Sequence, residues 1–151
     1  MDSEGLILLT SDGTLAHRIT DPQHKLSKVY LAQVERIPNE EVLAQLRNGV
    51  VLNGQKTRPA EVRLLPDDPQ LPDRPVPIRF RKQVSTTWVE IILREGLNRQ
   101  VRRMTAAVGH PTLRLVRIAI GPVVLGELQP GQWREVTNHE IAQIYSAAAG
   151  E

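Results

Sequence analysis

The sequence predicts one α+β domain built on a largely antiparallel sheet. Strand patterns joined by hairpins and short links outnumber patterns typical of βαβ crossovers, which favours antiparallel pairing. The chain has 151 residues, of which 40% are hydrophobic, enough for one domain with a core and too short to expect two. Residues 1–151 are therefore expected to form a single domain.

Hydrophobic pattern and turn residues predict the first elements. Residues 6–10 form a short continuous apolar run, which predicts a buried strand. The turn Ser11-Asp12-Gly13 is expected to start a short helix that ends near Thr20, before Asp21-Pro22. Residues 28–35 alternate in polarity and predict another strand.

A helix and a hairpin are predicted next. Residues 38–41 open a helix that Asn48-Gly49 closes. Its apolar stripe consists of Val42, Leu43 and Leu46. Asn53-Gly54 is a strong two-residue hairpin signal between residues 50–52 and residues 57–65.

The second half of the chain predicts a loop, two strands and two helices. Residues 66–77 hold five of the eleven prolines and predict a surface loop. Residues 86–93 and residues 113–120 predict strands on either side of an arginine-rich helix. Thr137-x-x-Glu140 is a capping box, which predicts a short C-terminal helix.

Positive charge is concentrated in residues 94–117. This segment has six arginines and one carboxylate, a net charge of +5. The remainder has 13 basic and 16 acidic residues, a net charge of −3, so the overall +2 conceals one positive region. A concentrated positive field suits a polyanion.

The arginine spacing predicts a helix with a cationic face. Asn98 is of a type that accepts hydrogen bonds from the N–H groups of a first turn, so it is expected to open the helix. The cationic face holds Arg99, Arg102 and Arg103, and the apolar face holds Val101, Met104 and Val108. The alternative is a solvated basic face, but the bounding Gly96 and Gly109 favour a binding site.

Aromatic content limits the kind of nucleic-acid binding that is expected. The aromatic residues are Tyr30, Phe80, Trp88, Trp133 and Tyr145. Stacking along an extended single strand normally uses several exposed rings, whereas a site for one extruded base needs only one. A generic single-strand binder is therefore disfavoured.

Composition excludes several other classes of function. With no cysteine, the chain has no disulfide, thiolate zinc site or cysteine nucleophile, and a reducing compartment is expected. No apolar run approaches the roughly 20 residues of a membrane span, and the acidic start differs from a secretory signal, so a cytoplasmic protein is expected. P-loop, dinucleotide-binding and nucleophile-elbow motifs are absent from the sequence. The histidines are too scattered for a metal motif, and His110 is expected in a turn, so neither metal nor cofactor is expected.

Several blocks of the sequence together resemble the pseudouridine synthases that modify ribosomal RNA. The branch resembled is the one that contains the enzyme of the small ribosomal subunit and the B-type, E-type and F-type enzymes of the large one. The blocks are residues 2–10, 28–30, 98–104, 109–111, 120–122 and 133–135. Residues 105–115 resemble the E-type enzymes most. The resemblance extends from Asp2 to about Glu140, nearly the whole chain.

The resemblance implies a fold, a reaction and a partner. The implied fold is the pseudouridine synthase fold without its N-terminal strands, and the sheet edge left exposed would favour self-association. The implied reaction breaks the N-glycosidic bond of one uridine, rotates the base and rejoins it through C5, without redox change or cofactor. The implied partner is 23S ribosomal RNA.

The resemblance also implies where the nucleophile belongs. In the family, the nucleophilic aspartate ends a Gly-Arg-Leu-Asp sequence, and two variable residues and a Ser or Thr follow it. Counting back three places from Ser3 places this aspartate immediately before Met1. Asp2 occupies a variable position and does not inherit the role. The 151 residues alone are therefore expected to be inactive.

The remaining site residues are carried over by motif position. Arg102 would keep the aspartate ionised and oriented. Tyr30 would stack on the extruded uracil and remove the C5 proton. The implied RNA-binding residues are Lys28, Asn98, Arg99, Gln100 and Arg103, with phosphate contacts from the lysine and the arginines. Arg74, Arg79, Arg81 and Lys82 would extend this track. Leu97 departs from an arginine found in many members, which would weaken RNA contact.

Alternatives remain open at this point. Tyr30 also suits a core position, and Arg102 also suits a structural salt bridge. The chain as a whole also suits a catalytically dead RNA-binding remnant or a protein-interaction domain whose basic face meets an acidic partner. RNA affinity that falls steeply with salt would favour the RNA readings.

Overall fold

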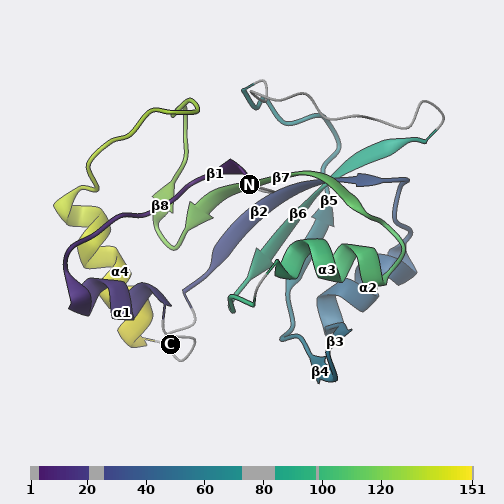
Figure 1. Ribbon diagram of the computed structural model, residues 1–151, viewed down its shortest axis with the longest axis horizontal. Helices are drawn as coiled ribbons and strands as arrows, with labels where there is room; N and C mark the ends of the chain where they lie inside the picture. The colour runs from purple at the N-terminus through teal and green to yellow at the C-terminus, as the bar shows by residue number, and fades with distance from the viewer. Residues whose placement is uncertain (1–3, 21–25, 73–83, 98, 151) are drawn as a thin grey trace.

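The protein is represented by a computed structural model, in which residues 4–20, 26–72, 84–97 and 99–150 are described (Figure 1). The helices are α1 (Gly13–Thr20), α2 (Glu40–Asn48), α3 (Gln100–Ala107) and α4 (Asn138–Gly150). The strands are β1 (Glu4–Gly5), β2 (Lys28–Glu35), β3 (Val51–Leu52), β4 (Gln55–Lys56), β5 (Glu61–Leu64), β6 (Thr86–Leu93), β7 (Thr112–Ile120) and β8 (Val123–Val124).

The main sheet has the strand order β1-β7-β2-β6-β5, and β8 pairs with β7. The long strands β2, β6 and β7 lie together at its centre and pair in an antiparallel manner. Among the described strands, only β1 and β7 pair in parallel. The prediction of a largely antiparallel sheet is therefore confirmed.

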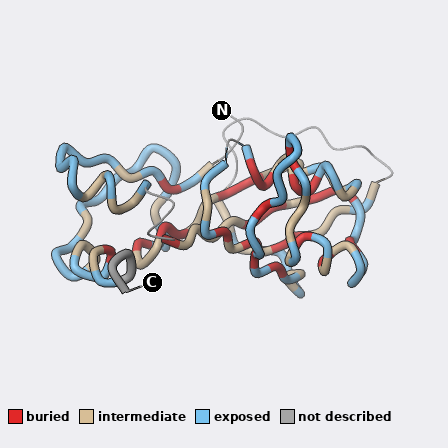
Figure 2. Tube along the Cα trace, turned by 90° about the horizontal axis from the view of Figure 1, so that it is seen from below, coloured by how far each residue is buried: buried red, intermediate tan, exposed pale blue. Residues whose placement is uncertain are grey.

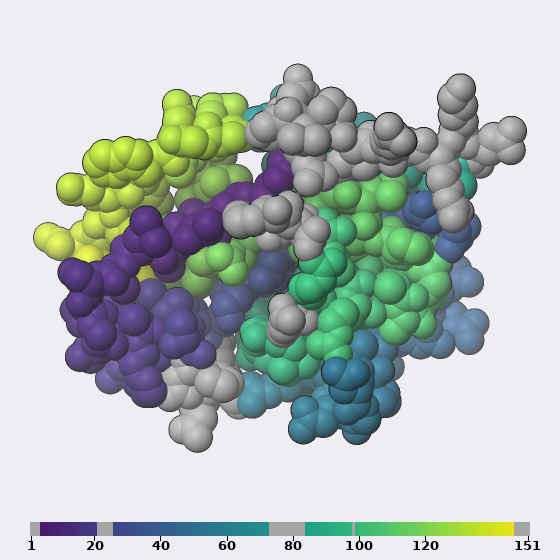
Figure 3. All heavy atoms as spheres, viewed as in Figure 1, coloured from purple at the N-terminus to yellow at the C-terminus, as the bar shows by residue number. Residues whose placement is uncertain are grey.

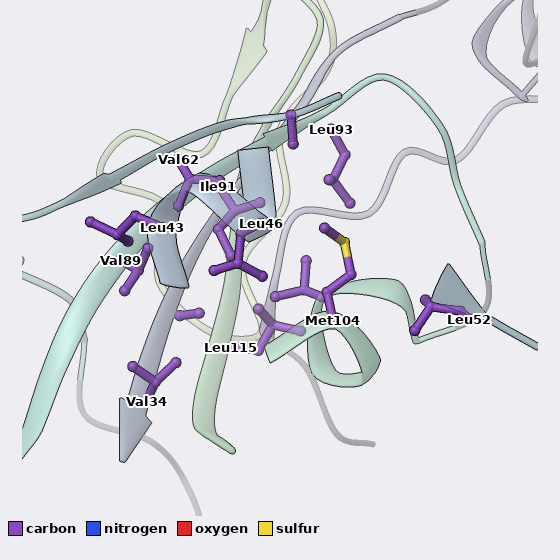
Figure 4. Packing of buried hydrophobic residues seen from close by; sticks show 13 residues of the cluster. Val34, Leu43, Leu46, Leu52, Val62, Val89, Ile91, Leu93, Met104 and Leu115 are labelled. Carbon is purple, nitrogen blue, oxygen red and sulfur yellow. The ribbon is translucent and has the colours of Figure 1, made fainter. Parts of the chain in front are cut away.

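Helices α2 and α3 cover one face of this sheet (Figure 1). Figure 4 shows Leu46 from α2 and Met104 from α3 pointing toward Ile91 and Leu115 of the sheet. The apolar side of α3 is therefore confirmed, since Val101 and Met104 are buried. These four residues belong to a larger group of buried residues, which we call the first core cluster. Its members are Ala32, Val34, Leu43, Leu46, Leu52, Ala60, Val62, Val89, Ile91, Leu93, Val101, Met104 and Leu115. It positions α3 against the central strands.

A second core cluster lies toward the chain ends. It consists of Leu6, Leu26, Ile120, Val123 and Ile144, with partly buried residues of α1 packed against it. Figure 2 shows that buried residues follow the sheet strands, whereas the loop between β8 and α4 is mostly exposed. The N-terminal segment, α1 and α4 thus form a layer beside the sheet.

Local chemistry accounts for several predicted boundaries. The Asn39 side chain accepts a hydrogen bond from Val42 N at the start of α2. Asn53 and Gly54 have φ values of 49° and 80°, as a tight hairpin between β3 and β4 requires. Thr137 and Glu140 exchange the two hydrogen bonds of a capping box, at 2.9 and 3.1 Å.

The predicted strand at residues 6–10 is wrong. The strand is β1, at Glu4–Gly5, and Leu6 N makes the last bond to the Arg117 carbonyl at 3.0 Å. The side chains of the apolar run are not all buried: Leu6 lies in the core, whereas Ile7 and Leu9 are exposed to solvent. Beyond Leu6 the β7 edge pairs with β8, so the chain turns away toward α1.

The predicted strand at residues 57–65 is only partly correct. Its last part is β5, which pairs with β6 in the main sheet, whereas the hairpin partner of β3 is β4. Pro59 lies between them and has no N–H to donate to a ladder. In the predicted loop, residues 66–72 have no helix or strand, and residues 73–77 lie outside the described residues.

Candidate active site

Tyr30 lies at the centre of the sheet. It is half-buried on β2 and packs against the first core cluster. Its strand neighbours are Ile91 on β6 and Arg117 on β7. Opposed residues in a sheet share a face, so Tyr30 and Arg117 project from the side that carries α3.

Lys28 precedes Tyr30 by two positions and shares its face. The pairing with β6 is regular here, because Lys28 lies opposite Leu93 as Tyr30 lies opposite Ile91. Burial lowers the pKa of the Lys28 ammonium, and the positive charge of Arg117 lowers it further. Lys28, Tyr30 and Arg117 therefore form one constellation.

Gly96 lies beside the end of the Lys28 side chain. A Cβ built at Gly96 would lie 3.3 Å from Lys28 Nζ, tighter than most real contacts of this kind. No positive φ accompanies this glycine. Gly96, on the loop between β6 and α3, is thus a close neighbour of the ammonium, and any side chain at this position would crowd it.

At least three of the six arginines in the basic segment bind distant parts of the protein. Arg114 donates two hydrogen bonds to Glu4, at 2.8 and 2.9 Å, and Arg117 donates two to the Leu6 carbonyl, at 2.9 and 2.6 Å. Arg94 forms an ion pair with Glu61 at 3.2 Å. Fewer of these arginines are therefore available for a polyanion than the net charge of +5 suggests. Two of them, Arg114 and Arg117, hold β1 and the residue after it.

The start of α3 differs in detail from the prediction. The helix begins at Gln100, and the preceding Arg99 has a left-handed backbone, with φ 51° and ψ 37°. The Arg99 side chain makes no capping hydrogen bond. Asn98, the predicted cap, lies outside the described residues. Arg99 therefore precedes the helix and does not belong to its regular cationic face.

Gln100 is only 4% exposed. Its amide nitrogen donates to Glu95 Oε2 at 2.8 Å, and its oxygen accepts from Leu97 N at 3.2 Å. Glu95 also accepts from Arg58 N at 2.6 Å. Gln100 thus holds the loop that carries Gly96. Because its side chain is buried, the structure gives no support to the predicted contact of Gln100 with RNA.

Arg102 is half-buried and extends toward the start of β7. Its Nη1 donates to the Thr112 carbonyl at 2.9 Å, and the hydroxyls of Thr105 and Thr112 lie 2.7 Å apart. Thr112 pairs with Val34, four positions from Tyr30, which corresponds to about 13 Å along the strand. Arg102, on α3, thus reaches the start of β7, whereas Tyr30 lies further along the sheet, four positions from the residue that pairs with Thr112.

The turn after α3 is held by contacts with the end of β2. Gly109 has a φ of 87°. The His110 ring donates from Nδ1 to the Glu35 carbonyl at 2.9 Å, and the His110 backbone N–H donates to the Thr105 carbonyl at 2.9 Å. Arg36 donates to the Gly109 carbonyl. His110 is thus engaged at a turn, as predicted.

Other predicted positions fall outside the described residues. They are Asp2, Arg74, Arg79, Arg81 and Lys82. Within the described ranges, no three histidine, cysteine, aspartate or glutamate residues form a group that could hold a metal ion. Among the helices of those same ranges, none is both long and apolar enough to cross a membrane.

Sequence reasoning missed the parts played by Arg117 and Gly96. Arg117 was visible only as one cation in a basic segment, and Gly96 only as a boundary of it. Their proximity to Lys28 depends on strand register, which pairs β2 with β7 across about 90 residues of sequence. In Figure 3, blue atoms of β2 are set back between the purple N-terminal segment and the green atoms around α3.

Comparison with known proteins identifies similar sequences and similar solved structures. The family model described as RNA pseudouridylate synthase matches residues 1–107. Ribosomal large subunit pseudouridine synthase E of Xanthomonas campestris pv. campestris is 59% identical over 133 residues, which are 88% of this chain and 71% of that protein. The Vibrio parahaemolyticus protein of the same name is 51% identical over 135 residues, which are 89% of this chain and 56% of that protein.

A solved structure supports the same comparison. It is described as a crystal structure of pseudouridylate synthase, and the TM-score is 0.77 at 34% sequence identity. The match covers 95% of this chain and 55% of that chain. The expected fold class is therefore confirmed over nearly the whole length of the sequence.

Proposed function

The chain belongs to the RNA pseudouridylate synthase family, and we propose that it serves to isomerise a uridine of 23S ribosomal RNA to pseudouridine. The family consists of isomerases, and the relatives from Xanthomonas and Vibrio are both named ribosomal large subunit pseudouridine synthase E. The resemblance to that type is thereby confirmed. Identity of 59% and 51% over most of the chain supports a substrate of the same class.

Tyr30 is the proposed contact for the extruded base. Its ring is half-buried at the sheet centre, against the first core cluster, which gives a rigid platform for stacking. Its hydroxyl gives the same side chain a group that can accept the C5 proton. This placement on the α3 side, beside Lys28 and Arg117, is the observation that carries the proposal.

Arg102 is the proposed partner of the nucleophilic aspartate. Because β1 runs parallel to β7, the N-terminal end of β1 points toward the Thr112 end of β7, where Arg102 lies. A nucleophilic aspartate bound at that end of β7 would lie next to Arg102. Pairing with the guanidinium would favour the ionised carboxylate that the reaction needs.

The outer side of α3 is the proposed RNA-facing surface. Arg99 is exposed and Arg103 is half-buried, so their guanidinium groups are suited to phosphate contacts that position RNA. Asn98 belongs to the same proposal by motif position. An enzyme of this kind needs no cofactor, and it works where ribosomes assemble, so the proposed location is the cytoplasm.

Mapping pseudouridine in ribosomal RNA tests this function. Large-subunit RNA would be compared between cells with and without the gene for this protein, by chemical labelling and primer extension. We expect one large-subunit position to lose its pseudouridine without the gene and to regain it on complementation with a gene that also encodes the Gly-Arg-Leu-Asp sequence. An unchanged pattern would favour the catalytically dead RNA-binding remnant or the protein-interaction domain instead.

A further inference from the structure

Two cations lie close together on the face of the sheet that carries Tyr30. Lys28 is half-buried, and the strongest charged influence on it is the like charge of Arg117. Among the described residues, no carboxylate pairs with Lys28. Holding two cations together in a partly desolvated position costs free energy, which a bound anion would recover.

The fold fixes both cations. Lys28 is paired on both sides, with Leu93 and with Ile120, within the central strands. Arg117 is fixed by its two hydrogen bonds to the Leu6 carbonyl. Little ordering is therefore required when a ligand binds, which favours affinity.

Gly96 keeps a side chain away from the Lys28 ammonium. A side chain at this position would begin 3.3 Å from Lys28 Nζ, where a ligand oxygen would otherwise approach. The loop is held in place from the other side by Gln100 and Glu95. These contacts hold the loop so that the Gly96 backbone stays beside the Lys28 ammonium.

We propose that Lys28, Arg117 and the backbone at Gly96 form a subsite for one phosphate group of the RNA backbone, next to the base held at Tyr30. The RNA as source of the phosphate rests on the proposed function. Lysine ammonium and arginine guanidinium groups both form charge-assisted hydrogen bonds with phosphate oxygens. The subsite would fix the target nucleotide by its backbone, while Tyr30 receives its base.

Gly96→Ala is the sharpest test, because its Cβ crowds the Lys28 ammonium without removing a charge. Gly13→Ala is the matched control, since a Cβ at Gly13 meets nothing within 4 Å and that glycine also has no positive φ. Lys28→Gln removes one cation, and Lys56→Gln on the distant exposed hairpin is its control. Urea unfolding of each variant would establish that it folds.

The first readout is a titration with inorganic phosphate, followed through backbone amide NMR signals. We expect phosphate to shift the signals of Gly96 and Lys28 in the unmodified protein, and Lys28→Gln to weaken binding by about tenfold. The phosphate affinity of Gly96→Ala should lie between that of the unmodified protein and that of Lys28→Gln. Both control variants should bind phosphate as the unmodified protein does. Phosphate binding by Gly96→Ala and Lys28→Gln that is as strong as that of the unmodified protein, or equal shifts with acetate, would overturn the phosphate subsite.

The second readout separates the subsite from the catalytic proposal. With a short RNA that contains the target uridine, Lys28→Gln should reduce the dependence of log affinity on log salt by about one. A protein that binds phosphate at these residues but makes no pseudouridine would leave the subsite standing and defeat the proposed function. An unchanged salt slope would contradict RNA as the source of the phosphate.

Discussion

Glu140 is the residue whose charge the surroundings affect most clearly. Its carboxylate accepts two hydrogen bonds from Arg134, at 2.9 and 2.8 Å, and one from Thr137 N at 2.9 Å. The Arg134 bonds first, and the Thr137 bond second, lower the pKa of Glu140 from 4.5 to about 2. The start of α4 therefore depends on a carboxylate that stays ionised in the folded protein.

The pKa of Glu140 predicts loss of stability in acid. Because it is lower in the folded state, its stabilising contribution is complete above pH 4.5 and decreases as the pH falls toward about 2. Glu140→Gln should lower the free energy of unfolding at pH 7, and this difference should shrink below pH 4.5. Urea unfolding across this range measures it, with Glu127→Gln as an exposed control. A difference between unmodified protein and Glu140→Gln that stays constant with pH would contradict the assignment.

At the residue scale, sequence patterns predicted caps and turns better than side-chain partners. Asn53-Gly54 and the Thr137 capping box depend only on neighbouring residues, so they could be read directly. The roles of Gln100 and Arg117 depend on residues far away in the sequence. A glutamine within a basic motif gives no sign that burial has turned its amide toward Glu95.

At the element scale, β1 is attached to the sheet by a few specific contacts. A Cβ at Gly5 would lie 2.4 Å from the Arg117 carbonyl oxygen, so only glycine permits this approach. The Arg114 to Glu4 ion pair is largely buried and holds the same strand. These contacts also fix Arg117, so β1 and the candidate site are structurally linked.

Gly5→Ala should detach β1 from β7. The substituted residue would have a φ of about 92° and would overlap the Arg117 carbonyl. Gly131→Ala is the control, because its φ of 81° is similar and a Cβ there meets nothing within 4 Å. The control should cost roughly 1–2 kcal/mol at most for its backbone conformation, and Gly5→Ala should cost more.

Urea unfolding and amide exchange measure this effect. The Leu6 N–H, which donates to the Arg117 carbonyl, should exchange faster in Gly5→Ala than in the control. Equal unfolding free energies for the two alanine variants would mean that β1 is not held as the structure indicates.

Element prediction succeeded where period and length were clear. The strands at residues 28–35 and 86–93 were predicted with the observed bounds, because residues 28–35 alternate in polarity and residues 86–93 are rich in residues that favour strands. Residues 6–10 were mispredicted because a continuous apolar run does not distinguish a strand from an extended segment over a core. The short β4 and β5 could not be assigned to separate sheets without their partners.

At the scale of the whole molecule, the sheet leaves β5 at one edge and β1 with β8 at the other. Both edges are short, which limits pairing with another copy. The sequence led us to expect self-association through an exposed edge, and this stays a prediction. The fold itself was predicted because family motifs are spread over nearly the whole chain, and the comparisons bear this out.

The central proposal is that this protein supports pseudouridine formation with Tyr30 in the site and with an aspartate from a Gly-Arg-Leu-Asp sequence as nucleophile. The most direct test is tritium release from C5-labelled large-subunit RNA, measured for the 151 residues alone and with an upstream extension that ends in Gly-Arg-Leu-Asp. We predict release only by the extended protein, and loss of release with Tyr30→Phe while RNA binding persists. Release by the 151 residues alone, or undiminished release by the Tyr30→Phe variant, would contradict the account.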